Sequence, residues 1–218
     1  MKTLFISDLH LSPDQPELIR LATEFVAKQS AVDAFYILGD IFNTWLGDDL
    51  IPAEFEPFIQ ALQNQQQNGS KIYLMQGNRD FMLGEGFARL VGGILLDDPV
   101  VVSLYGHSIL LMHGDSLCTD DVSYQRYRKV VRKRWLQKLF LAMPLSIRQR
   151  ISDKIKAKSK QQKQYKQAQI MDVNPAAVRQ VMKQYHVNLL LHGHTHRPAI
   201  QPLEPVRNIS NYRIVLGD

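Results

Sequence analysis

Apolar runs alternate with amphipathic stretches along the first third of the chain. The runs at 2–7, 34–38 and 71–76 are short and almost wholly apolar, which is typical of buried parallel strands. The segments between them repeat apolar residues at helical spacing and predict helices over 16–29 and 52–67. This alternation predicts an α/β fold. The side chains that we expect on the buried face of the first helix are Leu18, Leu21, Phe25 and Val26.

The pattern changes beyond residue 100. Two apolar runs at 100–104 and 107–112 flank Tyr105-Gly106 and predict a β-hairpin. From about 120 to 166 the sequence is helical in pattern, basic, and interrupted by Pro144. The remaining predicted elements are a helix with Asn174 as its N-cap that ends near His186, a buried strand over 187–191, and short strands up to Leu216.

Polar residues that can bind metal ions follow five of these predicted strands. Open α/β sheets bind ligands at the carboxyl ends of their strands, so we expect these side chains to meet at one edge. Carboxylate, imidazole and amide groups are all metal ligands. The seven candidates are Asp8, His10, Asp40, Asn78, His113, His194 and His196.

The turn around Gly193 carries two of these candidates. Gly193 allows a tight turn, so His194 and His196 can face a common point, and imidazole pairs suit transition metals. Two loop histidines in water explain this short motif equally well when it is taken alone. The four other strand ends favour the metal interpretation.

The composition is typical of an ordinary globular protein, and the chain of 218 residues is long enough for one α/β domain. The single cysteine, Cys118, excludes an intramolecular disulfide and fits a reducing cytoplasm. Asp8 comes too early for a signal peptide, and no apolar run approaches the ~20 residues that span a bilayer. We therefore expect a cytoplasmic protein that at most lies on a membrane surface.

Charge is distributed unevenly along the chain. The segment Arg126–Lys166 holds fifteen basic residues and one acid, Asp153, for a net charge of +14. The rest of the chain therefore carries −9 within a total of +5. Such asymmetry indicates an anionic partner for the basic segment: nucleic acid, an anionic membrane surface or a phosphorylated substrate.

The metal-binding candidates stand in the order Asp-x-His, Gly-Asp, Gly-Asn-x-Asp, His and Gly-His-x-His. This series resembles the calcineurin-like metallophosphoesterases over nearly the whole chain, and the structural context of each motif agrees. The resemblance implies an α/β/β/α sandwich. It further implies that residues 1–218 form one domain, into which 120–168 is inserted as a basic helical lid.

The resemblance also implies two metal ions per chain. They would share the carboxylate of Asp40, whose two oxygens can bind two ions. Mixed imidazole, carboxylate and amide ligands favour Mn²⁺ or Fe²⁺ over a thiolate-type zinc site, and we expect Mn²⁺. Ions roughly 3.5–4 Å apart ionise a bridging water at neutral pH and bind the oxygens of an in-line phosphoryl displacement. The first ion would be held by Asp8, His10, Asp40 and His196, and the second by Asp40, Asn78, His113 and His194.

Position 79 departs from a common form of the third motif. Many members of the family read Gly-Asn-His-Asp there, and that histidine can protonate a leaving group, whereas this chain has Arg79. Arginine stays cationic, so it stabilises negative charge but is a poor general acid. Because a phosphate leaving group hardly needs a proton, Arg79 favours cleavage of a pyrophosphate over hydrolysis of an alkyl phosphomonoester.

Longer stretches resemble a bacterial family of UDP-2,3-diacylglucosamine pyrophosphatases, which act in lipid A synthesis. They are 7–11, 45–49, 77–81, 113–121 and 170–174. This resemblance implies Mn²⁺-dependent cleavage of the UDP-sugar to UMP and the acylated sugar 1-phosphate, with attack at the uridine-side phosphorus. It implies catalytic roles for Asn78, Arg79 and His194, and substrate contacts from these three residues and from Asp121, Ser159, Lys163 and Lys166, where Lys163 replaces an asparagine expected in relatives.

The basic segment gains a role from this resemblance, as a lid that shelters acyl chains and contacts the anionic cytoplasmic face of the inner membrane. An ordinary core stripe under a solvated charged face is the plainer interpretation. A nucleic-acid-binding module would leave the seven strand-end candidates without a role, so we expect no nucleic-acid partner, and no obligate protein partner is evident. The apolar residues of the segment are Trp135, Leu136, Leu139, Phe140, Leu141 and Met143.

A metallophosphoesterase acting on a soluble nucleotide or a phosphoprotein is the alternative enzyme, although that activity would leave the apolar basic insert without a role.

Several other residues receive structural interpretations. We expect Cys118 and Trp45 to be packed side chains, and Asp80 and Asp115 to accept hydrogen bonds behind the metal ligands. His107, His186 and His192 should lie at the surface or behind the site.

Overall fold

The computed structural model describes residues 1–165, 172–206 and 209–217. Its first sheet is wholly parallel and follows the chain in the order β1-β2-β3-β4. Strand β2 is buried at every residue because it has a neighbour on both edges and both faces are covered. The strands are β1 (Thr3–Ile6), β2 (Ala34–Leu38), β3 (Lys71–Met75) and β4 (Ile94–Leu96).

The second sheet is mixed and has the order β5-β6-β7-β9-β8. Strands β5 and β6 form the predicted antiparallel hairpin, and β6, β7 and β9 run parallel to one another. Parallel pairing of β6 with β7 brings the segments that follow Met112 and His192 to the same edge. The strands are β5 (Val100–Leu104), β6 (His107–Met112), β7 (Leu189–His192), β8 (Ala199–Val206) and β9 (Ile209–Val215).

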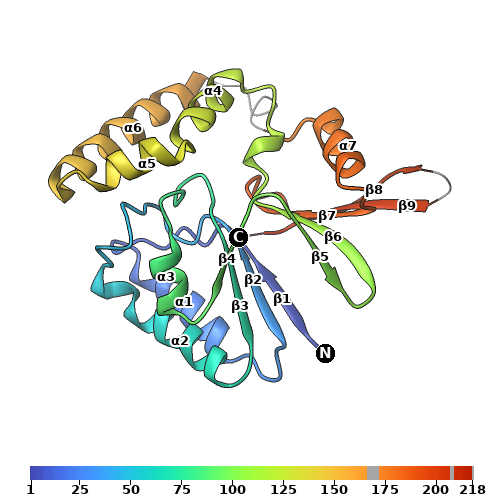
Figure 1. Cartoon of the computed structure of the whole chain (residues 1–218), viewed down its shortest axis with the longest axis horizontal. Helices are drawn as coiled ribbons and strands as arrows, with labels where there is room; N and C mark the ends of the chain where they lie inside the picture. The colour runs from blue at the N-terminus through green and yellow to red at the C-terminus, as the bar shows by residue number, and fades with distance from the viewer. Residues whose placement is uncertain (166–171, 207–208, 218) are drawn as a thin grey trace.

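Three apolar clusters hold four layers together. One cluster lies between the two sheets and includes Leu38, Met75 and Leu111. A second joins the outer face of the first sheet to α1 (Pro16–Ala27), α2 (Glu56–Gln67) and α3 (Glu85–Leu90), which lie together on that side in Figure 1. A third packs α7 (Pro175–Gln184) against the second sheet. The predicted α/β/β/α sandwich is therefore confirmed.

Three further helices lie across one end of the sandwich (Figure 1). They are α4 (Val122–Val131), α5 (Arg134–Leu141) and α6 (Leu145–Tyr165). Asp121 caps the N-terminus of α4 by accepting a hydrogen bond from the Tyr124 backbone N–H at 3.0 Å. No helix within the described residues is long and apolar enough to cross a bilayer.

Several sequence expectations need correction. The helix expected from residue 52 begins as a 3₁₀ turn, Ala53–Phe55, and the helical pattern after 120 follows a 3₁₀ turn at Asp115–Leu117 and divides into three helices. The pattern over 81–99 gave no element, yet α3 and β4 lie there. On α1, Leu21 and Phe25 are 55% and 42% exposed, because the helix packs through Ile19, Ala22 and Val26 instead.

Candidate metal centre

Residues after β1 and β2 form one wall of the site. Because the two strands run parallel in register, their carboxyl ends are side by side. Backbone bonds extend the pairing into the loops, from the Asp8 N–H to the Gly39 carbonyl at 3.0 Å and from the His10 N–H to the Asp40 carbonyl at 2.9 Å. Asp8, His10 and Asp40 are thereby fixed at one edge, as the sequence predicted.

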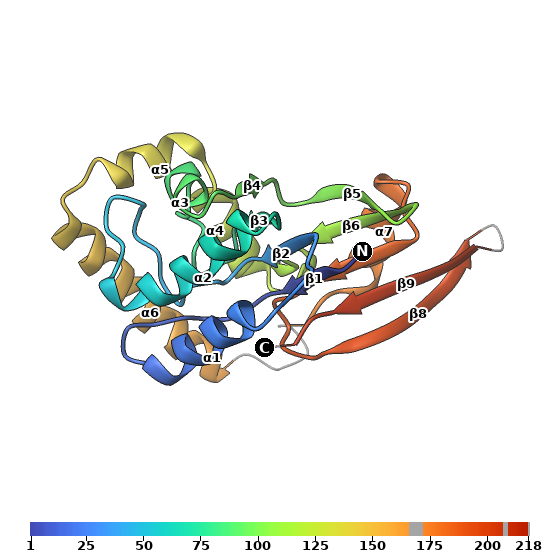
Figure 2. The same cartoon turned by 90° about the horizontal axis from the view of Figure 1, so that it is seen from below.

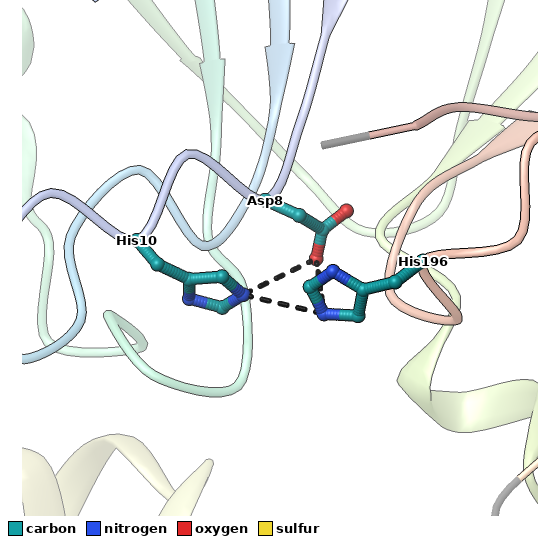
Figure 3. Close-up of side chains that lie close together, drawn as sticks. All are labelled: Asp8, His10 and His196. Carbon is teal, nitrogen blue, oxygen red and sulfur yellow. Dashed lines mark hydrogen bonds and ion pairs between the residues drawn. The ribbon is translucent and has the colours of Figure 1, made fainter. Parts of the chain in front are cut away.

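One cluster consists of Asp8, His10 and His196 (Figure 3). His10 Nε2 lies 3.4 Å from His196 Nε2, and each nitrogen lies 4.0 Å from Asp8 Oδ1. Ligand atoms around one transition-metal ion, each about 2.1 Å from it, are separated by roughly 3–4 Å. The three atoms therefore have the spacing of a coordination shell, and His10 Nδ1 is also 3.8 Å from Asp40 Oδ2.

A second cluster consists of Asp8, Asp40 and His113. His113 Nε2 lies 3.8 Å from Asp40 Oδ1 and 3.0 Å from Asn78 Oδ1, while His113 Nδ1 lies 2.9 Å from the Leu38 carbonyl. If Nδ1 carries the proton and donates to that carbonyl, Nε2 is free to bind a metal ion. The ring of His194 stands edge-on to His113 with centroids 5.1 Å apart.

The chemistry of this donor set fits divalent cations. Within the described residues, the buried atoms Asp8 Oδ1 and His10 Nδ1 have no hydrogen-bond partner. A buried carboxylate oxygen without a partner is costly, and a cation removes that cost. In each cluster the candidate ligand atoms all lie within 4.8 Å of one another. Asp8 belongs to both clusters, whereas Asp40 was the shared carboxylate expected from the sequence.

Burial and neighbouring charges shift the pKa values of the candidate histidines in different directions. Burial lowers the pKa of His10 to about 4 and that of His194 to about 3, so both rings are neutral and carry lone pairs at pH 7. Burial also lowers the pKa of His113, but Asp40 and its neighbouring carboxylates outweigh it and raise the value to about 9. Burial raises the pKa of Asp40 to about 7. A cation at this position would replace the proton in compensating these carboxylates.

Backbone strain is concentrated at the same residues. Five of the seven candidate ligands are non-glycine residues with positive φ, a conformation that costs roughly 1–2 kcal/mol for each. Strain of this kind persists where surrounding contacts hold the backbone, and it is typical of functional sites. The five residues are Asp8 at 56°, His10 at 48°, Asp40 at 52°, His194 at 69° and His196 at 53°.

Two glycines let the ligand loops approach one another. A β-carbon at Gly77 would overlap the backbone and carboxylate of Asp40, and a β-carbon at Gly193 would overlap Asp8 and Ser7. The His194 N–H donates to Asp8 Oδ2 at 2.7 Å through the approach that Gly193 permits. The glycines of the third and fifth motifs are therefore required sterically.

Asp80 ties the second and third motifs together beneath the ligands. Its fully buried carboxylate accepts backbone N–H bonds from Asp40 at 3.2 Å, Ile41 at 2.7 Å, Phe42 at 3.3 Å and Gly77 at 2.7 Å. Asp80 is thus a hydrogen-bond acceptor behind the site, as predicted.

A network of buried charges behind His113 was only partly foreseen. Asp115 accepts from the Tyr124 hydroxyl at 2.5 Å and from Arg128 Nε at 2.8 Å, as its acceptor prediction requires. Sequence reasoning missed Asp98, which accepts from the His113 N–H at 3.3 Å and from Arg128 at 3.2 Å. No spacing marks Asp98, and Arg128 is one of many basic residues in its segment. Only the fold brings them together.

The residues expected to contact substrate are less closely grouped. Arg79 is exposed beside the ligands, its backbone N–H donates to Asp40 Oδ1 at 2.7 Å, and its charge helps lower the pKa of His10. Asp121 is buried as the cap of α4, and Ser159 is exposed on α6. The side chain of Lys163 and the whole of Lys166 lie outside the described residues.

The structural interpretations of the other residues agree with their surroundings. Trp45 is buried and stacks on Phe42 with ring centroids 4.4 Å apart. Cys118 is buried, and burial raises the pKa of its thiol to about 12. His192 is buried behind the Gly193 turn and accepts from Arg213 Nε at 2.8 Å, whereas His107 and His186 are exposed.

Comparison with known proteins identifies a family and close relatives of this chain. The family model described as calcineurin-like phosphoesterase matches residues 1–198. A UDP-2,3-diacylglucosamine hydrolase of Histophilus somni is 47% identical over 218 residues, covering 100% of this chain and 92% of that protein. The enzyme of the same name from Serratia proteamaculans is 48% identical over 219 residues, covering 100% of this chain and 90% of that protein.

Proposed function

The chain belongs to the calcineurin-like phosphoesterase family, and on this basis we propose that it hydrolyses the pyrophosphate bond of UDP-2,3-diacylglucosamine, releasing UMP and 2,3-diacylglucosamine 1-phosphate. The observation that carries the proposal is the pair of ligand clusters at the strand ends, in a chain nearly half identical throughout to hydrolases named for this substrate. The acylated product, 2,3-diacylglucosamine 1-phosphate, would be an intermediate of lipid A synthesis.

Two Mn²⁺ ions are the proposed cofactors. When bound, they would supply the positive charge that acidifies water and binds the oxygens of a phosphoryl group in an in-line displacement. Hard oxygen and neutral imidazole donors suit Mn²⁺, and Cys118 stands outside both clusters. One ion would be held by Asp8, His10, Asp40 and His196, and the other by Asp40, Asn78, His113 and His194.

The side chains around the ions would bind and orient the substrate. The guanidinium of Arg79 would bind the pyrophosphate and stabilise the negative charge that develops on it. Asn78 and His194 would orient the attacked phosphoryl group. With attack at the uridine-side phosphorus, water oxygen ends in UMP, and the bridging oxygen leaves with the sugar phosphate as a stable anion that needs no general acid.

Residues 120–168 are proposed as a lid over this site, within a single domain of residues 1–218. Helix α5 supports the idea, because Trp135 is 64% and Leu139 51% exposed among basic neighbours. An apolar surface bounded by cations suits acyl chains attached to a phosphorylated sugar, and also the anionic cytoplasmic face of the inner membrane. Substrate contacts within the lid are proposed for Asp121, Ser159, Lys163 and Lys166.

Substrate comparison in H₂¹⁸O tests the proposal. The protein with Mn²⁺ is given UDP-2,3-diacylglucosamine, the deacylated UDP-glucosamine and bis(p-nitrophenyl) phosphate. We expect rapid release of UMP from the acylated substrate only, with ¹⁸O in UMP. Preference for the soluble phosphodiester would support the alternative enzyme, and ¹⁸O in the sugar phosphate would contradict attack at the uridine side.

A further inference from the structure

Helix α4 and its C-cap residue, Arg132, direct two arginine side chains at loops that carry candidate ligands. Arg128 and Arg132 are four residues apart, one helical turn, so they project from the same face. Their hydrogen bonds lead to the loop after β3, which carries Asn78, and to the segment around His113. Helix α4 thus contacts the two sheets where their polar loops meet.

Arg128 binds the surroundings of His113 on two sides. Its Nε donates to Asp115 at 2.8 Å, and its terminal nitrogen donates to Asp98 at 3.2 Å. Asp98 in turn accepts the backbone N–H of His113, and Asp115 follows His113 by two residues. Both carboxylates are buried, and Arg128 supplies compensating charge to each of them, together with His113 and Arg132. Loss of that charge would disturb the backbone that presents His113.

Arg132 holds the backbone that presents Asn78. It donates to the Gly77 carbonyl at 2.9 Å and to the Gln76 side chain at 3.1 Å. The Gln76 amide donates in turn to the Leu83 carbonyl at 2.5 Å, which closes the loop. Gly77, the residue before Asn78, is therefore held at both of its backbone groups: Arg132 donates to its carbonyl, and its N–H donates to Asp80.

The two supported ligands form one half of the centre, because Asn78 Oδ1 and His113 Nε2 are 3.0 Å apart. His10 and His196, and Asp8, which belongs to both clusters, stand on loops after β1 and β7. Within the described residues, the side-chain hydrogen bonds of Arg128 and Arg132 do not extend to these loops. The contacts of α4 are thus specific to one side of the site.

We propose that Arg128 and Arg132 are positioning residues that make binding of the metal ion at Asn78 and His113 depend on the docking of α4. This inference rests on the proposed two-metal site. Because such coupling is reciprocal, the second ion also stabilises docked α4. The docking of the helical segment that would cover substrate would therefore depend on whether the second metal ion is bound.

Variants of the full-length protein test the inference through metal stoichiometry. Arg132→Met keeps a long side chain and removes its hydrogen-bond donors. Arg132→Lys restores the charge and a single donor nitrogen, and Arg128→Lys keeps a charge but has one donor nitrogen in place of the two that bind the two carboxylates. Arg148→Met is the matched control, since Arg148 ties α6 to the Leu46 carbonyl and to Asp49 and touches no candidate ligand. Mn²⁺ is titrated by equilibrium dialysis, and EPR distinguishes a coupled ion pair from a single ion.

For Arg132→Met and Arg128→Lys we expect one Mn²⁺ bound as in wild type, the second bound about 10–100-fold more weakly, and loss of the coupled EPR signal. Arg132→Lys should recover part of the second affinity, and Arg148→Met should bind two ions as wild type does. Two ions bound with wild-type affinity by Arg132→Met, or equal weakening of both ions, would overturn the inference. A wild-type protein that binds fewer than two Mn²⁺ would instead contradict the proposed function on which it rests.

Discussion

Replacing Asp80 with asparagine should weaken both the fold and the metal centre. All four groups that face the carboxylate are backbone N–H donors, two at each oxygen. Burial raises the pKa of Asp80 and the backbone donors oppose that rise, because only the ionised form accepts at both oxygens. Asparagine must turn its NH₂ group toward one of the two donor pairs, whichever way the amide is oriented.

The magnitude follows from the two hydrogen bonds that are lost. A hydrogen bond to a charged group contributes about 1.5–3 kcal/mol, so Asp80→Asn should lower the free energy of unfolding by roughly 3–6 kcal/mol. That is a large fraction of the ~5–15 kcal/mol of an ordinary domain. One of the freed donors is the N–H of Asp40 or of its neighbour Ile41, so the affinity for Mn²⁺ should fall as well.

Urea unfolding of the metal-free protein measures the first effect, and dialysis against Mn²⁺ measures the second. Asp48→Asn is the matched control, because Asp48 accepts from Trp45 Nε1 and from the backbone N–H groups of Gly84 and Phe87, outside both ligand clusters. It should lose stability and keep its Mn²⁺ affinity. A loss below about 1 kcal/mol in Asp80→Asn, or unchanged Mn²⁺ binding, would refute this reasoning.

Three further predictions concern single positions. Cys118 has a pKa of about 12, so at pH 8 only about one thiol in ten thousand is ionised, and iodoacetamide should label it slowly until the protein unfolds; rapid labelling of native protein would contradict its burial. Asn174→Ala removes a cap that accepts N–H bonds at 2.8 and 3.4 Å, and urea unfolding should show a loss of ~1 kcal/mol. Gly193→Ala should lower the free energy of unfolding by roughly 1–3 kcal/mol and weaken Mn²⁺ binding, because the added β-carbon displaces Asp8. Gly217→Ala, whose β-carbon would have ordinary contacts, should bind Mn²⁺ as wild type does, and equal Mn²⁺ binding by the two variants would refute the steric argument.

The strand ends of the site were predictable from sequence because they depend on local pattern. Strand β2 and the hairpin strands have the predicted bounds, since short apolar runs between polar residues define them without reference to the rest of the fold. Parallel pairing then dictates that Asp8 and Asp40 meet, whatever the details of packing. The order of the motifs along the chain likewise predicted that the strand-end residues form one site.

Other features depend on contacts between distant segments. The surface on which α1 packs decides that Ile19 is buried and Leu21 exposed, whereas the periodic pattern had predicted Leu21 on the buried face and had not included Ile19. Asp98 and Arg128 are thirty residues apart, and nothing in their spacing pairs them. The left-handed backbone of the ligand residues also depends on the loops that converge there: aspartate and histidine adopt positive φ more often than most residues, but residue type alone does not say which of them will do so.

A metal-restoration assay tests whether the strand-end clusters form a two-metal centre that cleaves the UDP-linked pyrophosphate. Metal-stripped protein is titrated with Mn²⁺ while bound Mn²⁺ and release of UMP from UDP-2,3-diacylglucosamine are measured together, with Asp40→Ala and His194→Ala in parallel. We expect activity that rises with Mn²⁺ occupancy, reaches its maximum at two Mn²⁺ per chain, and is lost in both variants. UMP release by metal-stripped protein, or full activity in either variant, would contradict it.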